Sequence, residues 1–333
     1  MNYKMQLFFW ILVLLASVWA AHWGSDCLAD PLQKLRRQWG LSEAAGAAFV
    51  ALATASPEIG TNTASAVRGF SDIGLGNLLG SNIISVPAIV AVAYFANRHH
   101  HSRQQNERPT ALRVKPEALK VQTIPYIIII VLAALLTVPP AWRGLQPIDG
   151  WIMLAVYFFY LAQAIFRERQ PKQNVRWHKQ AIAIAISGVL VLAVAAYLIV
   201  TATERIVSIL GISELIGGLF ITSTLSVLPE IFATWKVAQS GQVTAATTSV
   251  IADNTATMTL ALFPLALVGL PIQNISLFTV NLAFVALLAI AYAAFIQWGK
   301  RQYSFEVWEV VSLIGIYVIY LGVMIFSVLP ASN

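Results

Sequence analysis

The sequence predicts an all-α membrane protein with about ten transmembrane helices in two inverted five-helix repeats, in which helices 2 and 7 are broken. Three observations carry this prediction: an apolar composition, ten apolar runs of spanning length and an internal repeat. Hydrophobic residues make up 58% of the 333 residues, and charged residues only 11%. A soluble domain has roughly 25% charged residues, so this chain lacks the polar surface that water requires.

The apolar runs are long enough to cross the hydrocarbon core of a bilayer, which takes about 20 helical residues. They lie near residues 6–22, 44–67, 73–97, 121–142, 147–166, 181–203, 212–235, 243–270, 275–298 and 307–329. The first run also resembles a cleavable signal peptide, because Lys4 precedes it and Ser17-Val-Trp-Ala20 follows its apolar centre. Run 181–203 plays the same part ahead of a second, similar segment, so we expect the first run to be a spanning helix.

Positive charge predicts the orientation of the chain, since Lys and Arg concentrate in cytoplasmic loops. Of the 21 Lys and Arg residues, one side of the predicted membrane has only Lys4, Arg68, Arg143 and Arg205. We therefore expect both termini outside the cytoplasm and the basic loops 98–120 and 167–180 inside it. The same asymmetry accounts for the net charge of +6 without nucleic acid. The expected location is the bacterial inner (plasma) membrane, as a multi-pass protein.

Two segments of the chain are similar to each other. Residues 40–58 read GLSEAAGAAFVALATASPE, and residues 211–230 read GISELIGGLFITSTLSVLPE. Both begin Gly-x-Ser-Glu and both end in proline and glutamate. The first copy lies in helices 2 and 3 and the second in helices 7 and 8, so an odd number of helices separates them and they enter the membrane from opposite sides. We therefore expect one membrane domain made of two inverted halves, 1–142 and 143–333, with the substrate site between them at mid-membrane.

Proline explains why helices 2 and 7 should break or kink. Pro57 and Pro229 cannot donate a backbone hydrogen bond and clash with the preceding turn. Carbonyls freed at that depth need protein, water or an ion as a partner. Glu58 and Glu230 follow the prolines directly, although an acid at a helix centre costs about 2.5 kcal/mol or more on insertion scales. Two carboxylates beside spare carbonyls favour a hard cation such as calcium or sodium.

These residues resemble a known family. Ala53-Thr-Ala-Ser-Pro-Glu58 and Leu75-Gly-Asn-Leu-Leu-Gly-Ser-Asn-Ile83 are similar to the first alpha-repeat motif of sodium/calcium exchangers, in the cation/calcium antiporter superfamily. The resemblance covers the whole ten-helix layout and is stronger in the first repeat than in the second. It implies that Glu58 and Glu230 ligate calcium and that carbonyls near Thr54 and Ser226 complete the site. The candidate cation ligands in motifs 52–85 and 222–257 are Thr54, Glu58, Ser81, Ser85, Ser226, Glu230, Asp253 and Thr257.

The chain departs from the family pattern in its second repeat. Ala252-Asp253-Asn254 replaces the family's Gly-Ser-Asn, and the central Asp or Asn four residues later is Ser85 in one half and Thr257 in the other. Asp253 and Thr257 are spaced i, i+4 and share one helix face. One interpretation is that the third carboxylate has moved by one turn and faces the two glutamates, where three acids need a cation to stay ionised. The alternative is that Asp253 caps a helix start.

Other departures concern the counter-ion. Ala55 and Val227 replace serines that help to hold sodium in the family, which leaves sodium coupling open. Gly76 and Gly80 form a small-xxx-small pair that is typical of close helix packing. For Asn77, Asn82 and Asn254, the alternative to a functional role is that they bridge helices by hydrogen bonds. For Asp26 and Asp30 we favour a solvated loop face.

The function that these observations favour is secondary antiport of a divalent cation, most of all calcium, against sodium or protons by alternating access. A cation channel, or an exchanger for another cation with altered sodium coupling, is the alternative. An intramembrane enzyme is disfavoured, because the sequence has no embedded Ser/His or Cys/His pair and no HExxH motif. We expect no cofactor other than the transported ions. The expected partners are the lipid bilayer and cations, not nucleic acid, and no oligomer is required.

Overall fold

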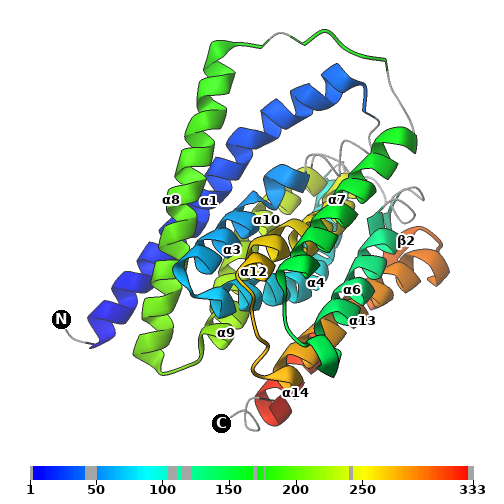
Figure 1. The fold of residues 1–333 in the computed structure, drawn as a ribbon. Coiled ribbons are helices and arrows are strands. Elements are labelled where there is room, and N and C mark those ends of the chain that lie inside the picture. The colour runs from blue at the N-terminus through cyan, green and yellow to red at the C-terminus, as the bar shows by residue number, and fades with distance from the viewer. Residues whose placement is uncertain are drawn as a thin grey trace. The chain divides into compact units, whose positions relative to one another are not determined.

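The protein is described by a computed structural model that covers residues 3–41, 51–103, 111–114, 122–167, 171–175, 177–239 and 243–328. Helices make up almost all of this part of the chain (Figure 1). They are α1 (Tyr3–Trp39), α3 (Ser56–Arg68), α4 (Ser71–Arg103), α6 (Ile124–Thr137), α7 (Pro147–Arg167), α8 (Lys179–Leu210), α9 (Glu214–Ile216), α10 (Ser223–Gln239), α11 (Val243–Ala256), α12 (Leu262–Leu267), α13 (Ile275–Trp298) and α14 (Val307–Val323). Shorter elements are the 3-10 turn η2 (Pro140–Trp142), the π-helices η3 (Gly217–Thr222), η4 (Thr257–Ala261) and η5 (Met324–Val328), and the strands β1 (Ala111–Arg113) and β2 (Ser304–Glu306).

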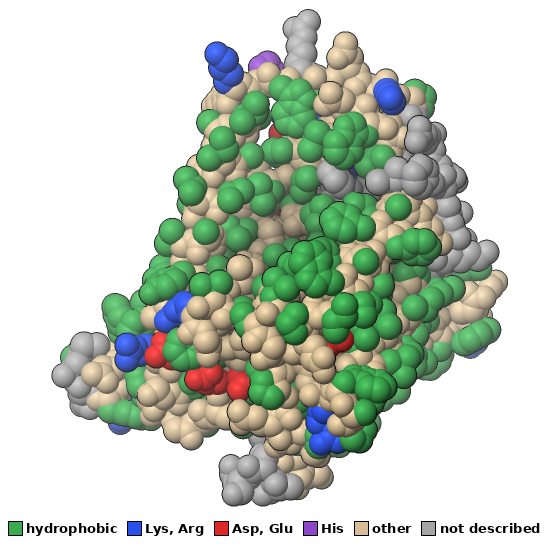
Figure 2. Space-filling view, in the orientation of Figure 1, with side chains coloured by type: hydrophobic (Ala, Val, Ile, Leu, Met, Phe, Trp, Pro, Cys, Tyr) green, Lys and Arg blue, Asp and Glu red, His purple; other side chains and the backbone are tan. Residues whose placement is uncertain are grey.

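Many of the helices have the length and composition of membrane spans. Within the described residues, seven are long and apolar enough to cross a membrane: Tyr3–Trp39, Ser71–His99, Lys179–Leu210, Glu214–Gln239, Ala246–Leu267, Ile275–Trp298 and Val307–Val328. Large apolar side chains lie exposed on them, with 81% of Trp298 and 81% of Phe326 accessible. Figure 2 shows hydrophobic side chains over most of the visible face and few charged ones. Such a surface suits lipid rather than water.

The chain folds into two compact units. The first contains Met1–Gly80, Leu145–Ser226 and Asp253–Leu270, and the second contains Ser81–Gly144, Val227–Ala252 and Pro271–Asn333. The boundaries fall inside α4, α10 and α11, which are the helices of the predicted site motifs. Each unit therefore takes segments from both halves of the sequence.

In the first unit, the N-terminal half of α1 packs against α8, and the two helices diverge beyond it (Figure 1). Leu14, Ala21, Ala195 and related apolar residues form their buried contact. Gly24 faces Gly188, and a Cβ on either glycine would overlap the other's carbonyl. Small residues permit this approach, which allows van der Waals packing to hold helices together in lipid.

Helix α1 is longer than the apolar run 6–22 that predicted it, so Asp26 and Asp30 lie in a helix and not in a loop, although both side chains are solvent-exposed as predicted, at 68% and 65%. Both aspartates lie within α1, where an oxygen of Asp26 is 3.8 Å from His22 and one of Asp30 is 2.6 Å from Lys34. Ion pairs at i, i+4 spacing support a helix through a polar stretch. The apolar run ends near residue 22, whereas the helix continues to Trp39.

Close glycine contacts also join the start of α4 to η3 in the first unit. A Cβ on Gly76 would overlap the Leu215 carbonyl, and one on Gly218 would overlap the Ile73 carbonyl. The packing role predicted for Gly76 and Gly80 is therefore confirmed, since the Gly80 position meets Leu219 and Ser223 in the same way. These contacts fix the two helices that contain the repeat motifs against each other.

In the second unit, hydrogen bonds from buried tyrosines join neighbouring helices. The Tyr126 hydroxyl of α6 donates to the Asn82 side-chain oxygen of α4 over 2.8 Å, and the Tyr320 hydroxyl of α14 donates to Asn281 of α13 over 2.7 Å. The Tyr292 hydroxyl donates to the Thr247 carbonyl over 3.2 Å. Polar groups in lipid need such partners. The bridging alternative is confirmed for Asn82. Strands β1 and β2, which belong to the same unit, pair antiparallel.

The two proline-containing helices differ from what proline alone predicts. The helical segment that leads into α3 has a single turn residue, Ala55, at φ −79° and ψ −4°, directly before Ser56 and Pro57. Helix α10 runs through Pro229 without interruption, so the expected break there is wrong. Its irregularity lies upstream, in the π-helix Gly217–Thr222, where the Ser223 hydroxyl donates to the Leu219 carbonyl. One missing N–H at Pro229 does not end a helix whose neighbouring turns are otherwise bonded.

Candidate cation site

The turn before α3 frees one backbone carbonyl and satisfies it with side chains. Because Pro57 has no N–H, the Ala53 carbonyl lacks its usual helical donor. The Ser56 hydroxyl donates to this oxygen over 2.6 Å, and the Ser25 hydroxyl of α1 donates to it over 2.6 Å from 28 residues earlier in the chain. The carbonyl is therefore not a spare cation ligand. Its two hydrogen bonds hold the start of α3 in place.

Glu58 lies in the first turn of α3 and is 2% exposed. In the part of the chain that the structure describes, its Oε2 atom has no hydrogen-bond partner. A buried carboxylate with an unpartnered oxygen costs free energy, unless a cation or a proton neutralises it. A helix N-terminus adds a favourable partial charge, although one side chain at the start of a helix gains only about 0.3–1 kcal/mol from it.

Asp253 is the second buried acid of the first unit. It is 6% exposed, its Oδ1 atom also lacks a partner among the described residues, and its charge acts on Glu58 through space. The Thr54 hydroxyl lies within hydrogen-bonding reach of this carboxylate, and of the Ala51 carbonyl at 3.2 Å. The structure thus brings Asp253 to Thr54 and Glu58, which lie one helical turn from each other and far from Asp253 in the sequence.

The alternative that Asp253 caps a helix start is wrong. Helix α11 begins at Val243, so Asp253 lies in its last turn and not at its first residue. The chain then passes into the π-helix that starts at Thr257. Single π-helical turns occur often at functional sites, because they shift side chains out of the regular helical register.

In the first unit, the candidate cation ligands Ser226 and Thr257 donate their hydroxyl protons to carbonyls of their own helical segments. Thr257 is 1% exposed, and its hydroxyl donates to the Asn254 carbonyl over 3.0 Å. The Ser226 hydroxyl donates to the Ser223 carbonyl over 3.0 Å and lies 3.4 Å from the Asn77 side-chain oxygen. Both oxygens keep lone pairs for a cation while their protons are engaged. The Asn77 contact also supports its bridging role between α4 and α10.

The remaining predicted ligands belong to the second unit. Ser81 and Ser85 lie in α4 and are 5% and 2% exposed, and Glu230 is half-buried in α10. Glu58 and Asp253, by contrast, are buried acids of the first unit. Nowhere in the described ranges does a group of three or more His, Cys, Asp or Glu side chains gather closely enough to hold a metal ion. Hydroxyls and carbonyls would therefore have to supply much of any coordination shell.

Several residues near the acids escaped prediction. Tyr157 and Tyr160 of α7 are 1% and 3% exposed and pack against Ala55 and Ala256, with ring centroids 6.1 Å apart. The Tyr157 hydroxyl interacts electrostatically with Asp253. Their i, i+3 spacing in an apolar helix was a signal that the sequence offered, but it is also the spacing of ordinary core aromatics. Ser25 had no sequence signal, because its partner is a backbone carbonyl.

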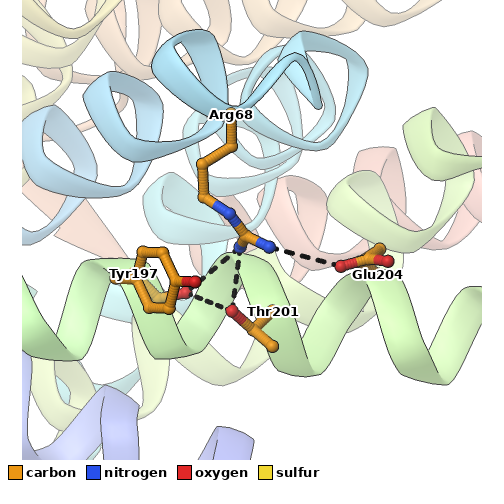
Figure 3. Close-up of polar contacts among 4 residues, drawn as sticks. All are labelled: Arg68, Tyr197, Thr201 and Glu204. Atoms are coloured by element: carbon orange, nitrogen blue, oxygen red, sulfur yellow. Dashed lines mark hydrogen bonds and ion pairs between the residues drawn. The ribbon is translucent and has the colours of Figure 1, made fainter.

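A polar cluster fixes the far end of α3 to α8 (Figure 3). The Arg68 guanidinium donates to the Thr201 hydroxyl over 2.8 Å and to Glu204 over 3.3 Å, and it stacks 4.5 Å above the Tyr197 ring. Both charged side chains are partly exposed, at 18% for Arg68 and 24% for Glu204. In the middle of the same helix, the Asn62 side chain donates to the Ala261 carbonyl over 2.9 Å. Helix α3 is therefore held along its length.

Long apolar helices around a buried pair of acids are typical of an ion transporter rather than an enzyme or a soluble binding domain. The chain belongs to the sodium/calcium exchanger protein family, whose family model matches residues 9–166 and 180–326. It is thus a multi-pass integral membrane protein of a family of calcium antiporters. This finding confirms the family that the sequence motifs indicated.

Relatives with known sequences support this assignment. The uncharacterized membrane protein MJ0091 of Methanocaldococcus jannaschii is 24% identical over 291 residues, which is 84% of this chain and 89% of that protein. The putative antiporter CaxA of Alkalimonas amylolytica is 25% identical over 63% of this chain and 66% of its own length. The sodium/calcium exchanger MaX1 of Methanosarcina acetivorans is 37% identical, over 71 residues that make up 21% of this chain and 20% of that one.

Solved structures share the fold. The H+/Ca2+ exchanger CAX superposes with a TM-score of 0.72 at 13% identity, covering 98% of this chain and 82% of that chain. The sodium-calcium exchanger NCX_Mj superposes with a TM-score of 0.64 at 21% identity, covering 95% and 99%. At these identities the likeness establishes the fold of a cation exchanger and leaves the transported ions open.

Proposed function

We propose that this protein is a secondary active antiporter that moves calcium across the membrane in exchange for sodium or protons by alternating access. The observation that carries the proposal is the buried pair Glu58 and Asp253, each with one carboxylate oxygen that lacks a partner in the described part of the chain. Two carboxylates close together in a low-dielectric interior repel each other. A divalent cation between them removes this repulsion and supplies both missing partners.

The oxygen chemistry of the site suits calcium. Calcium takes about six to eight oxygen ligands from carboxylates, carbonyls, hydroxyls and water, in a flexible arrangement. Glu58 and Asp253 would supply the charge and Thr54, Ser226 and Thr257 neutral oxygens from the first unit. Glu230, Ser81 and Ser85, which belong to the second unit, stay predicted cation ligands. No resident cofactor is needed for this reaction.

The counter-ion has two candidates. Among the structures with the same fold, one is named an H+/Ca2+ exchanger and another a sodium-calcium exchanger. Buried Ala55 and Val227 offer no hydroxyl to a second cation, which favours protons over sodium. A proton needs only one carboxylate oxygen, whereas sodium needs several ligands.

The topology that goes with this function is ten transmembrane helices in two inverted halves, 1–142 and 143–333. Both termini would lie outside the cytoplasm, with loops 98–120 and 167–180 inside and the protein in the cytoplasmic membrane. The small number of basic residues on the outer side supports this orientation. A reporter fusion at Arg103 should report the cytoplasm, and a signal from the outside would overturn the orientation.

The experiment that tests the function measures radiolabelled calcium flux in proteoliposomes, with sodium and pH gradients imposed separately. Calcium accumulation driven uphill by one of the two gradients is the expected result, with Glu58→Gln as the inactive control. Calcium movement that only runs downhill, whatever the gradient, would identify a channel. Absence of calcium flux together with flux of another cation would identify a different substrate.

A further inference from the structure

The most informative polar contact outside the acids is the hydrogen bond between α1 and the turn that precedes Pro57. The Ser25 hydroxyl, on a side chain that is 3% exposed, donates to the Ala53 carbonyl over 2.6 Å. Both residues belong to the first unit. Ser25 is the only described residue of α1 for which a side-chain hydrogen bond to this carbonyl is seen, and the bond joins two segments 28 residues apart.

The acceptor of this bond is unusual because proline created it. The Ala53 oxygen would accept from residue 57 in a regular helix, but Pro57 has no N–H. Its two lone pairs accept from the hydroxyls of Ser25 and Ser56 instead. Ala53 is fully buried, so water offers no ready replacement for a lost donor. An unsatisfied carbonyl in that position costs free energy.

This carbonyl lies directly before the residues that contribute side chains to the acidic site. Thr54, the next residue, reaches Asp253, and Glu58 follows one turn later. Between them, Ala55 is the single turn residue, at φ −79° and ψ −4°. Any rotation of the Ala53 peptide therefore changes the directions in which Thr54 and Glu58 leave the backbone.

We propose that Ser25 is a positioning residue of the cation site: with Ser56 it holds the Ala53 carbonyl and thereby fixes Thr54 and Glu58 against Asp253. This inference rests on the proposed function, since it assigns Ser25 to the calcium site that Glu58 and Asp253 form. It adds α1 to the elements that determine cation affinity. No residue of α1 was expected to take part.

Helix α1 supplies a matched control. Ser17 is also buried, at 4% exposed, but its hydroxyl donates to the Val13 carbonyl of its own helix over 2.7 Å. Replacing Ser17 or Ser25 by alanine removes the same atoms from the same helix. Only the Ser25 change reaches the turn before Pro57.

The test is a double-substitution cycle on the purified protein in proteoliposomes, read out as the KM and the maximal rate of radiolabelled calcium uptake. The variants are S17A, S25A, S56A and the double variant S25A/S56A. We expect S17A to match the wild type and S25A and S56A each to raise KM by about two- to fivefold, the worth of one hydrogen bond, with the maximal rate retained. The double variant should raise KM by more than the product of the two single effects, because only then is the Ala53 carbonyl without a donor.

Thermal unfolding of each variant separates positioning from general stability. We expect S25A and S17A to melt within a few degrees of each other, while only S25A raises KM. Equal KM values for these two variants overturn the inference, as does a double variant whose KM is the simple product. If S25A does not fold, S56A carries the test, and an unchanged KM in S56A overturns the inference. Absence of calcium uptake by the wild type overturns the proposed function and this inference together, whereas the other outcomes leave the function standing.

Discussion

Two regions of the molecule contain the same Pro-Glu pair and fold differently around it. In the Pro57 arm, residues 51–68, the helix has a turn at Ala55, and two serine hydroxyls take up the carbonyl that proline leaves free. In the Pro229 arm, residues 214–239, α10 continues through the proline, and the irregular turn is a π-helix seven or more residues earlier. The two copies are similar in sequence but differ in local backbone conformation.

The difference teaches that proline removes a donor but does not decide how the helix responds. At Pro57, the hydroxyls of Ser25 and Ser56 donate to the carbonyl that would otherwise lack a partner, so a turn is stable there. In the Pro229 arm, Gly217 and Gly218 allow close packing and Ser223 bonds the Leu219 carbonyl, so the irregularity settles in η3. Surrounding donors and small residues determine where a membrane helix departs from regular geometry.

The largest expected effect concerns the two glutamates. Glu58→Gln and Glu230→Gln should each lower calcium flux about 100-fold or more, since each removes one charge from a divalent cation at low dielectric, where a charge pair is worth several kcal/mol. Flux in proteoliposomes measures the effect, and membrane insertion with size-exclusion profile controls for folding. Loss in only one variant would show that the arms are functionally unequal as well as structurally different. Wild-type flux in either variant contradicts the assignment of that residue.

The next effect compares the prolines. Pro57→Ala restores an N–H that competes with Ser25 and Ser56 for the Ala53 carbonyl, so we expect a regular helix and a KM for calcium raised about tenfold, the equivalent of about 1.4 kcal/mol. Pro229→Ala adds an N–H to a helix that is already continuous, and we expect at most about a twofold change. Equal effects of the two substitutions on KM would remove the distinction between the arms.

A smaller effect is expected at Asp253. Protons and calcium compete for the carboxylate oxygens, so calcium affinity should fall as the pH is lowered. Asp253→Asn removes one of the competing carboxylates and should weaken calcium binding by about three- to tenfold, the range of a charge-assisted contact, while flattening its dependence on pH. Calcium titrations at a series of pH values, for the wild type and the variant, provide the measurement. An unchanged pH profile in the variant would remove Asp253 from the site.

The smallest effect concerns the far end of the Pro57 arm. Arg68→Ala removes a partly exposed ion pair and a stacking contact with Tyr197, together worth about 1 kcal/mol. We expect a melting temperature lowered by a few degrees and a calcium KM that stays at the wild-type value. A raised KM would mean that the whole arm, and not only its start at Pro57, controls the site.

Much of this arrangement could be predicted from the sequence. The family and the apolar helices follow from composition and from motifs in which hydropathy acts locally, and the role of Glu58 as a ligand stays a prediction. The π-helices and the continuous α10 could not be predicted, because they depend on which donors lie nearby in space. The same holds for Ser25 and for Tyr157, whose partners are a carbonyl and an acid in distant segments. The capping alternative for Asp253 failed because only the structure shows where α11 begins.

The central claim is that Glu58 and Asp253 of the first unit form the cation site. The most direct measurement is equilibrium binding of radiolabelled calcium to the purified protein in detergent, for the wild type, Glu58→Gln and Asp253→Asn. We predict saturable binding to the wild type, weaker and less pH-dependent binding to Asp253→Asn, and no saturable binding to Glu58→Gln. Wild-type affinity in Glu58→Gln would contradict the claim.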